Sequence, residues 1–593
     1  MDRVGDARGY GRGIMKKIIV RRDNNASGDN LPADLHPVLR RVFLSRQLRS
    51  GAELHYGLDA LLAWDDLKGI DAAVELLRSA LRRRQRILIV ADFDADGATS
   101  CAVAVRGLRL LGAQDVRYVV PNRFAFGYGL TPEIVAVAAE QLPDLIVTVD
   151  NGISSVEGVK AAKDRGIGVL ITDHHLPGAV LPAADAIVNP NQPEDRFASK
   201  HLAGVGVMFY VLLALRARLR EEGWFVERGI AMPNLAQLLD LVALGTVADV
   251  AALDYNNRIL VSQGLARIRA GRGCEGIRAL IAVAGGDQTR LVAADLGFLV
   301  GPRLNAAGRI DDMSLGIACL LCDDADQAGA MAARLDELNR TRRTIETQMQ
   351  GQAMAAISAL QVGEDDPGLA VGVCLFQEDW HQGVIGILAS RLKDHLHRPV
   401  IAFAAGDEGT LKGSARSVHG LHIRDVLDAV AARHPGMLAK FGGHAMAAGL
   451  TLARDHFAEF SAAFDAEVRR HLAPEDLRGV ILSDGELGPE CLNLELAETL
   501  RSAGPWGQAF PEPVFDGAFE IVNRRVVGQR HLKLVVKTVG DDRLLDAIAF
   551  NSEGLIADHA ARVRMAYRLD VNDYRGRRSP QLLVEHLEPA ADL

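Results

Sequence analysis

The chain has few cysteines, few aromatic residues and no long apolar run. Six cysteines in 593 residues are too sparse for a disulfide-built secreted scaffold and suit a reducing compartment, so a cytoplasmic location is expected. No stretch reaches the ~18 apolar residues of a membrane-spanning helix, and the polar N-terminus lacks the apolar segment of a secretory signal. Cys319 and Cys322 form a CxxC pair, but their apolar, helical context favours core thiols over a zinc or redox site.

An excess of positive charge is also absent. The net charge of -9 argues against indiscriminate binding to polyanions. It does not exclude a nucleic-acid enzyme, because carboxylates gathered at a metal site add negative charge and a local basic groove is what contacts phosphates. At this length, three or four domains are expected.

The patterning divides the chain into five segments. Residues 1–37 are polar and predict a disordered leader, and 38–323 alternate apolar strands with helices, which is typical of an α/β domain with a parallel sheet. Residues 324–362 predict one long connecting helix, and 363–473 a second, smaller α/β unit. From 474 to 593 short strands, at 514–527, 531–538, 544–550 and 565–574, predict a small antiparallel barrel.

Three apolar strands in the first α/β domain each end in acidic or imidazole side chains. The strands are 86–91, 144–149 and 168–172. Ligands of such sheets bind outside the carboxyl ends of the strands, so these side chains are expected to meet at one edge. They are Asp92, Asp94 and Asp96 after the first strand, Asp150 after the second, and Asp173, His174 and His175 after the third.

This set predicts a two-metal centre for phosphoryl transfer. Asp94 and Asp96 are two residues apart, so in an extended segment both side chains leave on the same side. Together with Asp150 they would repel one another unless cations lay between them, about 3.5–4 Å apart in a two-metal site. Imidazole suits Mn²⁺ as well as Zn²⁺, and Asp249 is the natural further ligand. Asp92 or Asp173 alone could be a helix N-cap, but caps do not explain the surplus carboxylates.

Three Gly-rich segments could bind phosphate. Residues 301–309 carry Arg303, Asn305 and Arg309, which could position phosphate oxygens, or could form a loop with solvated arginines. Residues 413–417 and 442–445 combine small residues with Arg or His, which suits a phosphate cradle.

The C-terminal barrel is basic, which fits a single-strand nucleic-acid platform. Its aromatics are few, so electrostatics would outweigh base stacking, and a purely structural barrel with ordinary surface charge stays open. The cations are Arg524, Arg525, Arg530, His531, Lys533, Lys537, Arg575, Arg577 and Arg578.

With these motifs in order, the chain resembles the DHH phosphoesterase superfamily, and within it the bacterial single-strand-specific 5′→3′ DNA exonucleases. The resemblance runs from about residue 38 to the C-terminus. It implies a DHH catalytic domain, a DHHA1 domain, the helix that joins them, and an OB-fold. The motifs that carry it are Asp92-Phe93-Asp94-Ala95-Asp96-Gly97-Ala98-Thr99, Val149-Asp150-Asn151-Gly152, Asp173-His174-His175, Gly245-Thr246-Val247-Ala248-Asp249, residues 301–309 and Phe441-Gly442-Gly443-His444.

The resemblance also implies roles for individual residues. Two Mn²⁺ or Mg²⁺ ions would be held by Asp94, Asp96, Asp150, His174 and Asp249, with Asp150 bridging. His175 would contact or polarise the scissile phosphate, Asp92 would lie at the edge of the site, and Asn305 and Arg309 would support it. Arg123, Ser414 and Arg416 would cradle the 5′-terminal phosphate, and His444 would line the cleft from the second domain.

The implied reaction is attack of a metal-activated water on the phosphodiester, which releases 5′-mononucleotides from single-stranded DNA in repair and recombination. By analogy, a single-strand-binding protein and a helicase would be partners, and a monomer is expected. Two alternatives remain. Sibling phosphodiesterases or pyrophosphatases resemble only the first two domains, and a non-catalytic scaffold would be expected to have lost ligand residues.

Overall fold

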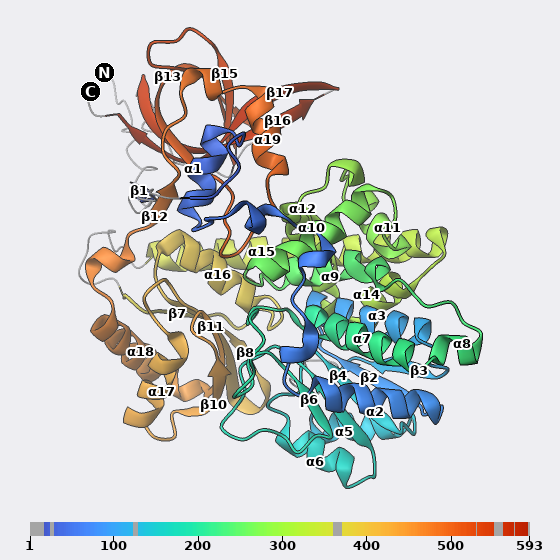
Figure 1. Cartoon of the computed structure of the whole chain (residues 1–593). Coiled ribbons are helices and arrows are strands. Elements are labelled where there is room, and N and C mark those ends of the chain that lie inside the picture. Colours follow the sequence, from blue (N-terminus) through green and yellow to red (C-terminus); the bar gives the residue numbers. More distant parts are fainter. Residues whose placement is uncertain are drawn as a thin grey trace.

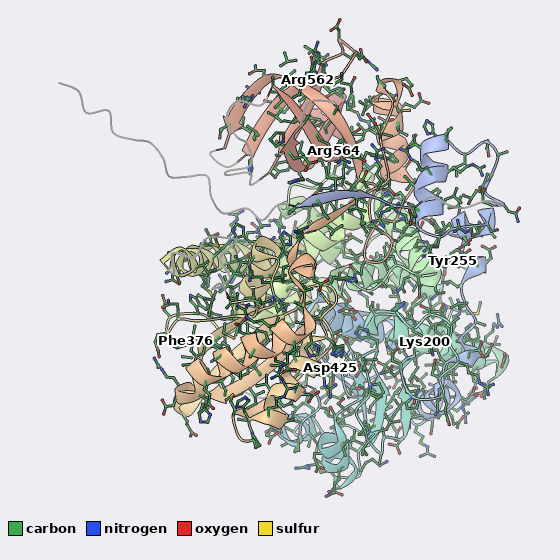
Figure 2. All side chains as sticks on the ribbon, turned by 90° about the vertical axis from the view of Figure 1, so that its left-hand side faces the viewer. Lys200, Tyr255, Phe376, Asp425, Arg562 and Arg564 are labelled. Carbon is green, nitrogen blue, oxygen red and sulfur yellow. The ribbon has the colours of Figure 1, made fainter. Side chains whose placement is uncertain are left out.

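Two α/β domains lie side by side beneath a β-barrel in the computed structural model (Figure 1). The structure describes residues 17–23, 29–121, 129–359, 370–528, 531–550, 561–574 and 576–590. Within these ranges no helix is both long and apolar enough to cross a membrane. In Figure 2, Lys200 and Tyr255 mark the first α/β domain, Phe376 and Asp425 the second, and Arg562 and Arg564 the barrel.

The first domain is built on a five-stranded parallel sheet in the order β3-β2-β4-β5-β6. Strands β2 and β4 are buried along their whole length because helices cover both faces, which explains their continuous apolar sequences. One face packs against α2, α3 and α7, and the other against α5 and α6. The strands are β2 (Ile87–Ala91), β3 (Val116–Val119), β4 (Leu145–Val149), β5 (Gly168–Thr172) and β6 (Ala186–Val188). The covering helices are α2 (Ile70–Arg82), α3 (Ala95–Leu110), α5 (Pro132–Ala139), α6 (Val156–Lys163) and α7 (Gly204–Glu221).

A helical subdomain completes the first domain and leads into the long helix α15 (Ala325–Ala359). Helix α15 packs against this subdomain at its start and against the second domain at its end, so it joins the two. The subdomain consists of α8 (Trp224–Arg228), α9 (Leu239–Ala248), α10 (Tyr255–Arg269), α11 (Glu275–Val283), α12 (Ala293–Asp295), α13 (Gly301–Ile310) and α14 (Ser314–Leu321).

The second domain has a mixed sheet in the order β10-β11-β9-β8-β7, of which only β7 and β8 pair in parallel. Helices α15 and α16 cover one face, and α17 and α18 the other. The elements are β7 (Val373–Phe376), α16 (Ile385–Leu396), β8 (Val400–Ala405), β9 (Thr410–Arg416), α17 (Ile423–Arg433), β10 (Leu438–Gly443), β11 (Ala447–Ala453) and α18 (Phe457–His471).

The C-terminal strands close into a barrel in the order β13-β14-β15-β17-β16, preceded by α19 (Leu494–Ser502). All of its pairings are antiparallel except β15 with β17, and β17 is a strand that the sequence did not predict. The predicted fold class, a parallel-sheet domain and a smaller α/β domain joined by a long helix with a C-terminal barrel, is confirmed. The strands are β13 (Phe515–Val527), β14 (His531–Thr538), β15 (Leu545–Ala549), β16 (Arg562–Tyr574) and β17 (Arg577–Pro589).

The expectation of a disordered leader over residues 1–37 is wrong where the structure describes that segment. Strand β1 (Ile18–Arg21) pairs in parallel with β12 (Val480–Ser483), and Arg21 Nε donates a 2.9 Å hydrogen bond to Asp516 Oδ1 on β13. Helix α1 (Pro37–Ser45) then packs into the main core. The strand is apolar in three of its four residues, but it is short and lies in a polar segment, and its ladder partner lies in a distant part of the sequence. Residues 1–16 and 24–28 lie outside the described residues.

Candidate metal centre between the two α/β domains

Strand β2 leads into helix α3, and Asp94 and Asp96 lie at the start of that helix. Asp94 caps α3, with Oδ1 accepting a 3.0 Å hydrogen bond from Gly97 N. Asp96 lies in the first turn of this helix and is buried. The expectation that Asp94 and Asp96 share one side of an extended segment is therefore wrong, because the chain turns into the helix between them.

The start of a second helix, α7, fixes the carboxylate of Asp96. Gly204 N and Val205 N donate hydrogen bonds to its two oxygens, at 2.6 and 3.1 Å. A helix N-terminus favours a negative charge, so α7 stabilises this buried carboxylate with two shorter hydrogen bonds than the 3.5 Å one from Ser100 Oγ. Sequence reasoning missed this contribution of Gly204. The available signal was the run of small residues at 203–206 that opens a helical pattern.

Asp150 holds the centre of the site in an unusual backbone conformation. Its φ is +61°, in the left-handed region that non-glycine residues seldom adopt, and Gly204 lies against it. A Cβ on Gly204 would approach Asp150 Cβ to 2.7 Å. Glycine at 204 therefore makes room for the side chain that occupies the middle of the carboxylate cluster.

His174 connects three of these carboxylates. Its Nε2 lies 3.1 Å from Asp150 Oδ1, 3.8 Å from Asp249 Oδ2 and 3.9 Å from Asp96 Oδ2. Asp249 is the C-cap residue of α9, so its carboxylate lies at the C-terminal end of that helix. Three overlapping groups of potential ligand atoms, each within 4.8 Å of one another, result: Asp150, His174 and His175; Asp96, His174 and Asp249; and Asp92, Asp94 and Asp150.

His175 is held by its own neighbour in the motif. Its Nδ1 lies 2.8 Å from Asp173 Oδ1, and the backbone N–H groups of His174 and His175 also donate to that oxygen. Burial alone would lower the pKa of His175, but the bond to Asp173 and the charges of Asp173, Asp92 and Asp249 together outweigh it and raise the pKa to about 9. Asp173 therefore orients a cationic imidazole beside the cluster.

The carboxylates of the cluster resist ionisation together. Burial and the charges of Asp249 and Asp94 raise the pKa of Asp96 to about 7, and burial and Asp94 raise that of Asp249 to about 7. Burial, followed by Asp96 and Asp94, raises the pKa of Asp150 well above its usual value. Such a set of buried oxygens with one imidazole is a donor set that fits Mn²⁺ or Mg²⁺, since divalent cations would offset the repulsion.

These pKa values predict how metal and pH act on stability. An aspartate whose pKa rises from about 3.9 in the unfolded chain to about 7 stabilises the metal-free fold below pH 4, and this contribution is lost as the pH rises through 7. We therefore expect the melting temperature of chelator-treated protein to fall between about pH 4 and 7, and Mn²⁺ to raise it most above about pH 7.

Differential scanning fluorimetry in both conditions checks this expectation. The Asp249→Asn variant is the comparison, because it removes one of the coupled charges. A metal-free pH slope as steep in this variant as in the unchanged protein would contradict the assignment.

The second α/β domain contributes to the same region. The ring of His444 stacks on that of His175, with centroids 6.1 Å apart and planes inclined by 23°. Arg309 Nη1 lies 3.4 Å from Gly383 O, which places the end of α13 against the turn before α16. The metal cluster therefore lies at the junction of the two domains.

The Gly-rich segment 301–309 is a helix, α13, so the alternative of a loop is wrong. Asn305 on this helix accepts a 2.8 Å hydrogen bond from Ala95 N, next to Asp94. Arg303 is buried and lies 2.7 Å from Asp336, so the alternative of solvated arginines is wrong for that residue. Asn305 thus fixes the backbone that presents the first carboxylates.

Ser414 and Arg416 lie on β9, next to the start of α16. Arg416 Nη1 donates a 3.1 Å hydrogen bond to Ser414 Oγ, and a Cβ on Gly386 in the first turn of α16 would approach Arg416 Nη2 to 3.0 Å. Burial lowers the pKa of Arg416, and within the described ranges no carboxylate pairs with it. A partly buried guanidinium beside a helix N-terminus favours an anionic ligand.

Two sets of predicted residues are less informative. Arg123 lies outside the described residues, as do Arg530 and Arg575. Among the barrel cations, Lys533 pairs with Asp546 at 3.0 Å and Arg578 pairs with Glu498 at 2.5 Å. Part of the basic character of the barrel is thus neutralised within the chain, and its nucleic-acid role stays a prediction.

Comparison with known proteins agrees with this architecture. Residues 86–246 match the N-terminal domain of the DHH family, 366–470 the DHHA1 domain and 483–586 the RecJ OB domain. The chain is 57% identical over 561 residues to the single-stranded-DNA-specific exonuclease RecJ of Dickeya dadantii, covering 94% of this chain and 97% of the relative. It is 54% identical to RecJ of Escherichia coli over 97% of this chain and all of that protein.

Solved structures give the same result. The structure of RecJ from Thermus thermophilus in complex with Mn²⁺ matches with a TM-score of 0.77 and 30% identity, covering 95% of this chain and 79% of that chain. The structure of that protein with Mg²⁺ matches with a TM-score of 0.72, covering 95% and 78%. On sequence identity over nearly its whole length, and on all three of its domains, the chain belongs to the RecJ family of DHH phosphoesterases.

Proposed function

We propose that the protein is a metal-dependent exonuclease that hydrolyses single-stranded DNA from its 5′ end and releases 5′-mononucleotides. The observation that carries this proposal is the cluster of carboxylates and imidazole at the domain junction, which His444 of the second domain faces. The second domain also holds a partly buried arginine, Arg416, without a carboxylate partner in the described ranges. Its relatives are named single-stranded-DNA-specific exonucleases, which supports the same substrate.

Five residues would hold two Mn²⁺ or Mg²⁺ ions: Asp94, Asp96, Asp150, His174 and Asp249. When bound, such ions lower the pKa of water and neutralise charge on the scissile phosphate. Asp150 has the central position that a bridging ligand needs, since its carboxylate belongs to two of the three candidate ligand groups. Asp92 belongs to one group, with Asp94 and Asp150, and would lie at the edge of the site.

The remaining side chains orient the phosphodiester. His175, kept protonated at neutral pH by Asp173, would donate to a non-bridging phosphate oxygen as negative charge grows there. Asn305 holds the start of α3, and Arg309 joins the site to the second domain. His444 would line the passage for the strand from the side of the second domain.

Polarity would come from a 5′-phosphate site beyond the metal ligands. Ser414 and Arg416 on β9, together with the N-terminus of α16, form a surface suited to a terminal phosphate, and Arg123 would add to it. We expect Arg416→Ala to raise KM for a 5′-phosphorylated strand by roughly ten- to a hundredfold, with kcat little changed. That effect corresponds to about 1.4–3 kcal/mol for hydrogen bonds to a charged group.

Steady-state kinetics on 5′-phosphorylated and 5′-hydroxyl strands measure this effect. Lys393→Ala, at the far end of α16 and paired with Asp394, is the matched control and should leave both substrates unaffected. Equal losses of Arg416→Ala on both strands would count against the 5′-phosphate site.

The function is tested by following products from a 5′-phosphorylated single-stranded oligonucleotide with Mn²⁺ or Mg²⁺. The same strand in a blunt duplex and a matched RNA are compared with it. Stepwise release of mononucleotides from the 5′ end of the single strand supports the proposal. Cleavage of RNA or short dinucleotides alone would place the chain among sibling phosphodiesterases, and no cleavage of any substrate would indicate a scaffold.

We also propose a cellular setting. The protein would act in the cytoplasm, as a monomer, on strands opened by a helicase and coated by a single-strand-binding protein during DNA repair and recombination. Gel filtration with light scattering tests the monomer. Co-purification from cross-linked cells tests the two partners.

A further inference from the structure

A largely apolar cavity begins one residue beyond Asp249, a proposed metal ligand. It has a volume of about 370 Å³, within the range of small-molecule sites. Its walls come from α9, α10, α12 and the turn before α13, and from residues 501–512, which lead into the barrel; none of the described residues that line it belongs to the second domain. In Figure 1, α10 and α12 lie on the barrel side of the first domain. The cavity therefore lies where the first domain meets the segment that leads to the barrel.

Val250 connects the cavity to the metal centre. It follows Asp249 directly, so the two Cα atoms are about 3.8 Å apart. Val250 is 63% exposed and lines the cavity. Its φ is +59°, a conformation that is rare for a β-branched residue and that clusters at ligand sites. A strand whose scissile phosphate lies at the metal centre can therefore reach the cavity with its next nucleotides.

Phe298 provides an exposed aromatic ring at the cavity. It lies in the π-helical turn Leu296–Val300, is 75% exposed, and contacts no other aromatic ring in the part of the chain that the structure describes. Such π-helical turns are frequent at functional sites. The wall formed by Trp506 is firmly held, because its ring stacks on Phe510 with centroids 5.1 Å apart and its Nε1 donates a 2.9 Å hydrogen bond to Leu500 O. An exposed ring beside a rigid apolar wall suits a flat ligand.

The cavity also carries a positive charge. Arg269 is exposed, and its Nε donates a 2.7 Å hydrogen bond to Leu291 O, which holds the guanidinium at the cavity. Within the described ranges Arg269 forms no salt bridge, whereas the other charged residues of the lining, Arg501 and Glu512, are both paired. Because a guanidinium suits phosphate, Arg269 favours a ligand that joins a flat apolar group to an anion.

We propose that the cavity takes one base of the single-stranded substrate, on the 3′ side of the scissile phosphate. The base would stack on Phe298 and lie against Val250, while a neighbouring phosphate contacts Arg269. With the 5′ end at Arg416 of the second domain, the strand beyond the metal centre would run over the first domain, where the cavity lies. A base in a duplex stays paired and stacked, so the site would favour single strands without reading their sequence. This role rests on the proposed exonuclease function and extends it.

Binding of strands that lack one base tests the site. Fluorescence anisotropy is measured in Mg²⁺ on 5′-phosphorylated strands with cleavage-resistant phosphorothioate linkages, each with a single abasic position. We expect one abasic position within the first few nucleotides to weaken binding to the unchanged protein by roughly tenfold, the size expected for stacking of one base on an aromatic side chain. Phe298→Ala should lose the same factor on the complete strand and show no further loss at that position.

Three further variants separate stacking from a general structural effect. Phe298→Tyr keeps the ring and should bind like the unchanged protein, whereas Phe298→Leu is apolar without a flat ring and should bind as weakly as Phe298→Ala. Leu142→Ala is the matched control, because Leu142 is 72% exposed and does not line the cavity, and it should have no effect. Thermal melting checks that each variant is folded.

The proposal is overturned if no strand binds, if every abasic position has the same effect, if Phe298→Ala binds the complete strand as well as the unchanged protein does, or if the two losses add. Failure of the base site differs from failure of the exonuclease function. Position-dependent binding without cleavage of ordinary DNA would contradict the exonuclease activity and support the base site. Cleavage of ordinary DNA with a uniform abasic profile would contradict the base site alone.

Discussion

Asp150→Ala is expected to reduce kcat on single-stranded DNA by at least about a thousandfold while leaving the protein folded. Asp150 lies at the centre of the candidate ligand set, 3.1 Å from His174 Nε2, and its carboxylate belongs to two of the three ligand groups. Ligands that stabilise charge in a two-metal reaction contribute several kcal/mol, and about 4 kcal/mol corresponds to a thousandfold change in rate.

Replacing the carboxylate of Asp150 should remove activity, but it should not lower the thermal stability that is measured without metal. Removing one of several buried carboxylates relieves the electrostatic repulsion that helps to raise the pKa values of the others. Alanine at a φ of +61° costs about 1–2 kcal/mol, so Asp150→Asn is the sharper variant, because asparagine tolerates this conformation. We expect Asp150→Asn to be as inactive as Asp150→Ala and to melt no lower than the unchanged protein without metal.

Product release and thermal melting, measured on the same preparations, check both expectations. Asp164→Asn is the matched control, since this carboxylate is the exposed C-cap of α6 in the same domain. Exonuclease activity within tenfold of the unchanged protein in either Asp150 variant would contradict the two-metal interpretation.

The sheet and the convergence of its carboxylates could be predicted because both depend on local sequence. A strand that is buried on both faces is apolar at every position, and the carboxyl ends of parallel strands share one edge. Asp92, Asp94, Asp150 and His174 therefore had to lie near one another once the strands were recognised. The mutual position of Asp94 and Asp96 was wrong because the chain enters a helix between them.

The rest depended on packing between distant segments, which leaves little local signal. Gly308 made segment 301–309 resemble a loop, yet it is helical, and a Cβ there would approach Phe93 O to 1.8 Å. Gly308 thus allows α13 to approach the backbone of Phe93 closely, and it does not mark a turn. Strand β1 is similar, since the short run Ile18–Arg21 becomes part of a sheet only by pairing with the distant β12.

Gly204→Ala is the substitution outside the ligand set with the largest expected effect. The added Cβ would lie 2.7 Å from Asp150 Cβ and 2.9 Å from its Cα, and neither atom can rotate away. Either α7 or Asp150 must move, and the 2.6 Å hydrogen bond from Gly204 N to Asp96 moves with the helix. We expect kcat to fall about a hundredfold or more, because a displacement of about 1 Å has an effect of this size. Overpacking should also destabilise the fold by about 1–3 kcal/mol.

Gly206→Ala distinguishes this close contact from a general effect of alanine in α7. Gly206 is two residues further along the same helix, and a Cβ there would meet the end of the Leu202 side chain, at 3.1 Å. That side chain can yield, and alanine is the better helix former by up to about 1 kcal/mol, so stability should be kept or slightly raised. Exonuclease kinetics, Mn²⁺ titration and thermal melting of both variants decide the matter. Equal losses in the two would mean that α7 tolerates no side chain at its start, and that Gly204 has no special role in placing Asp150 and Asp96.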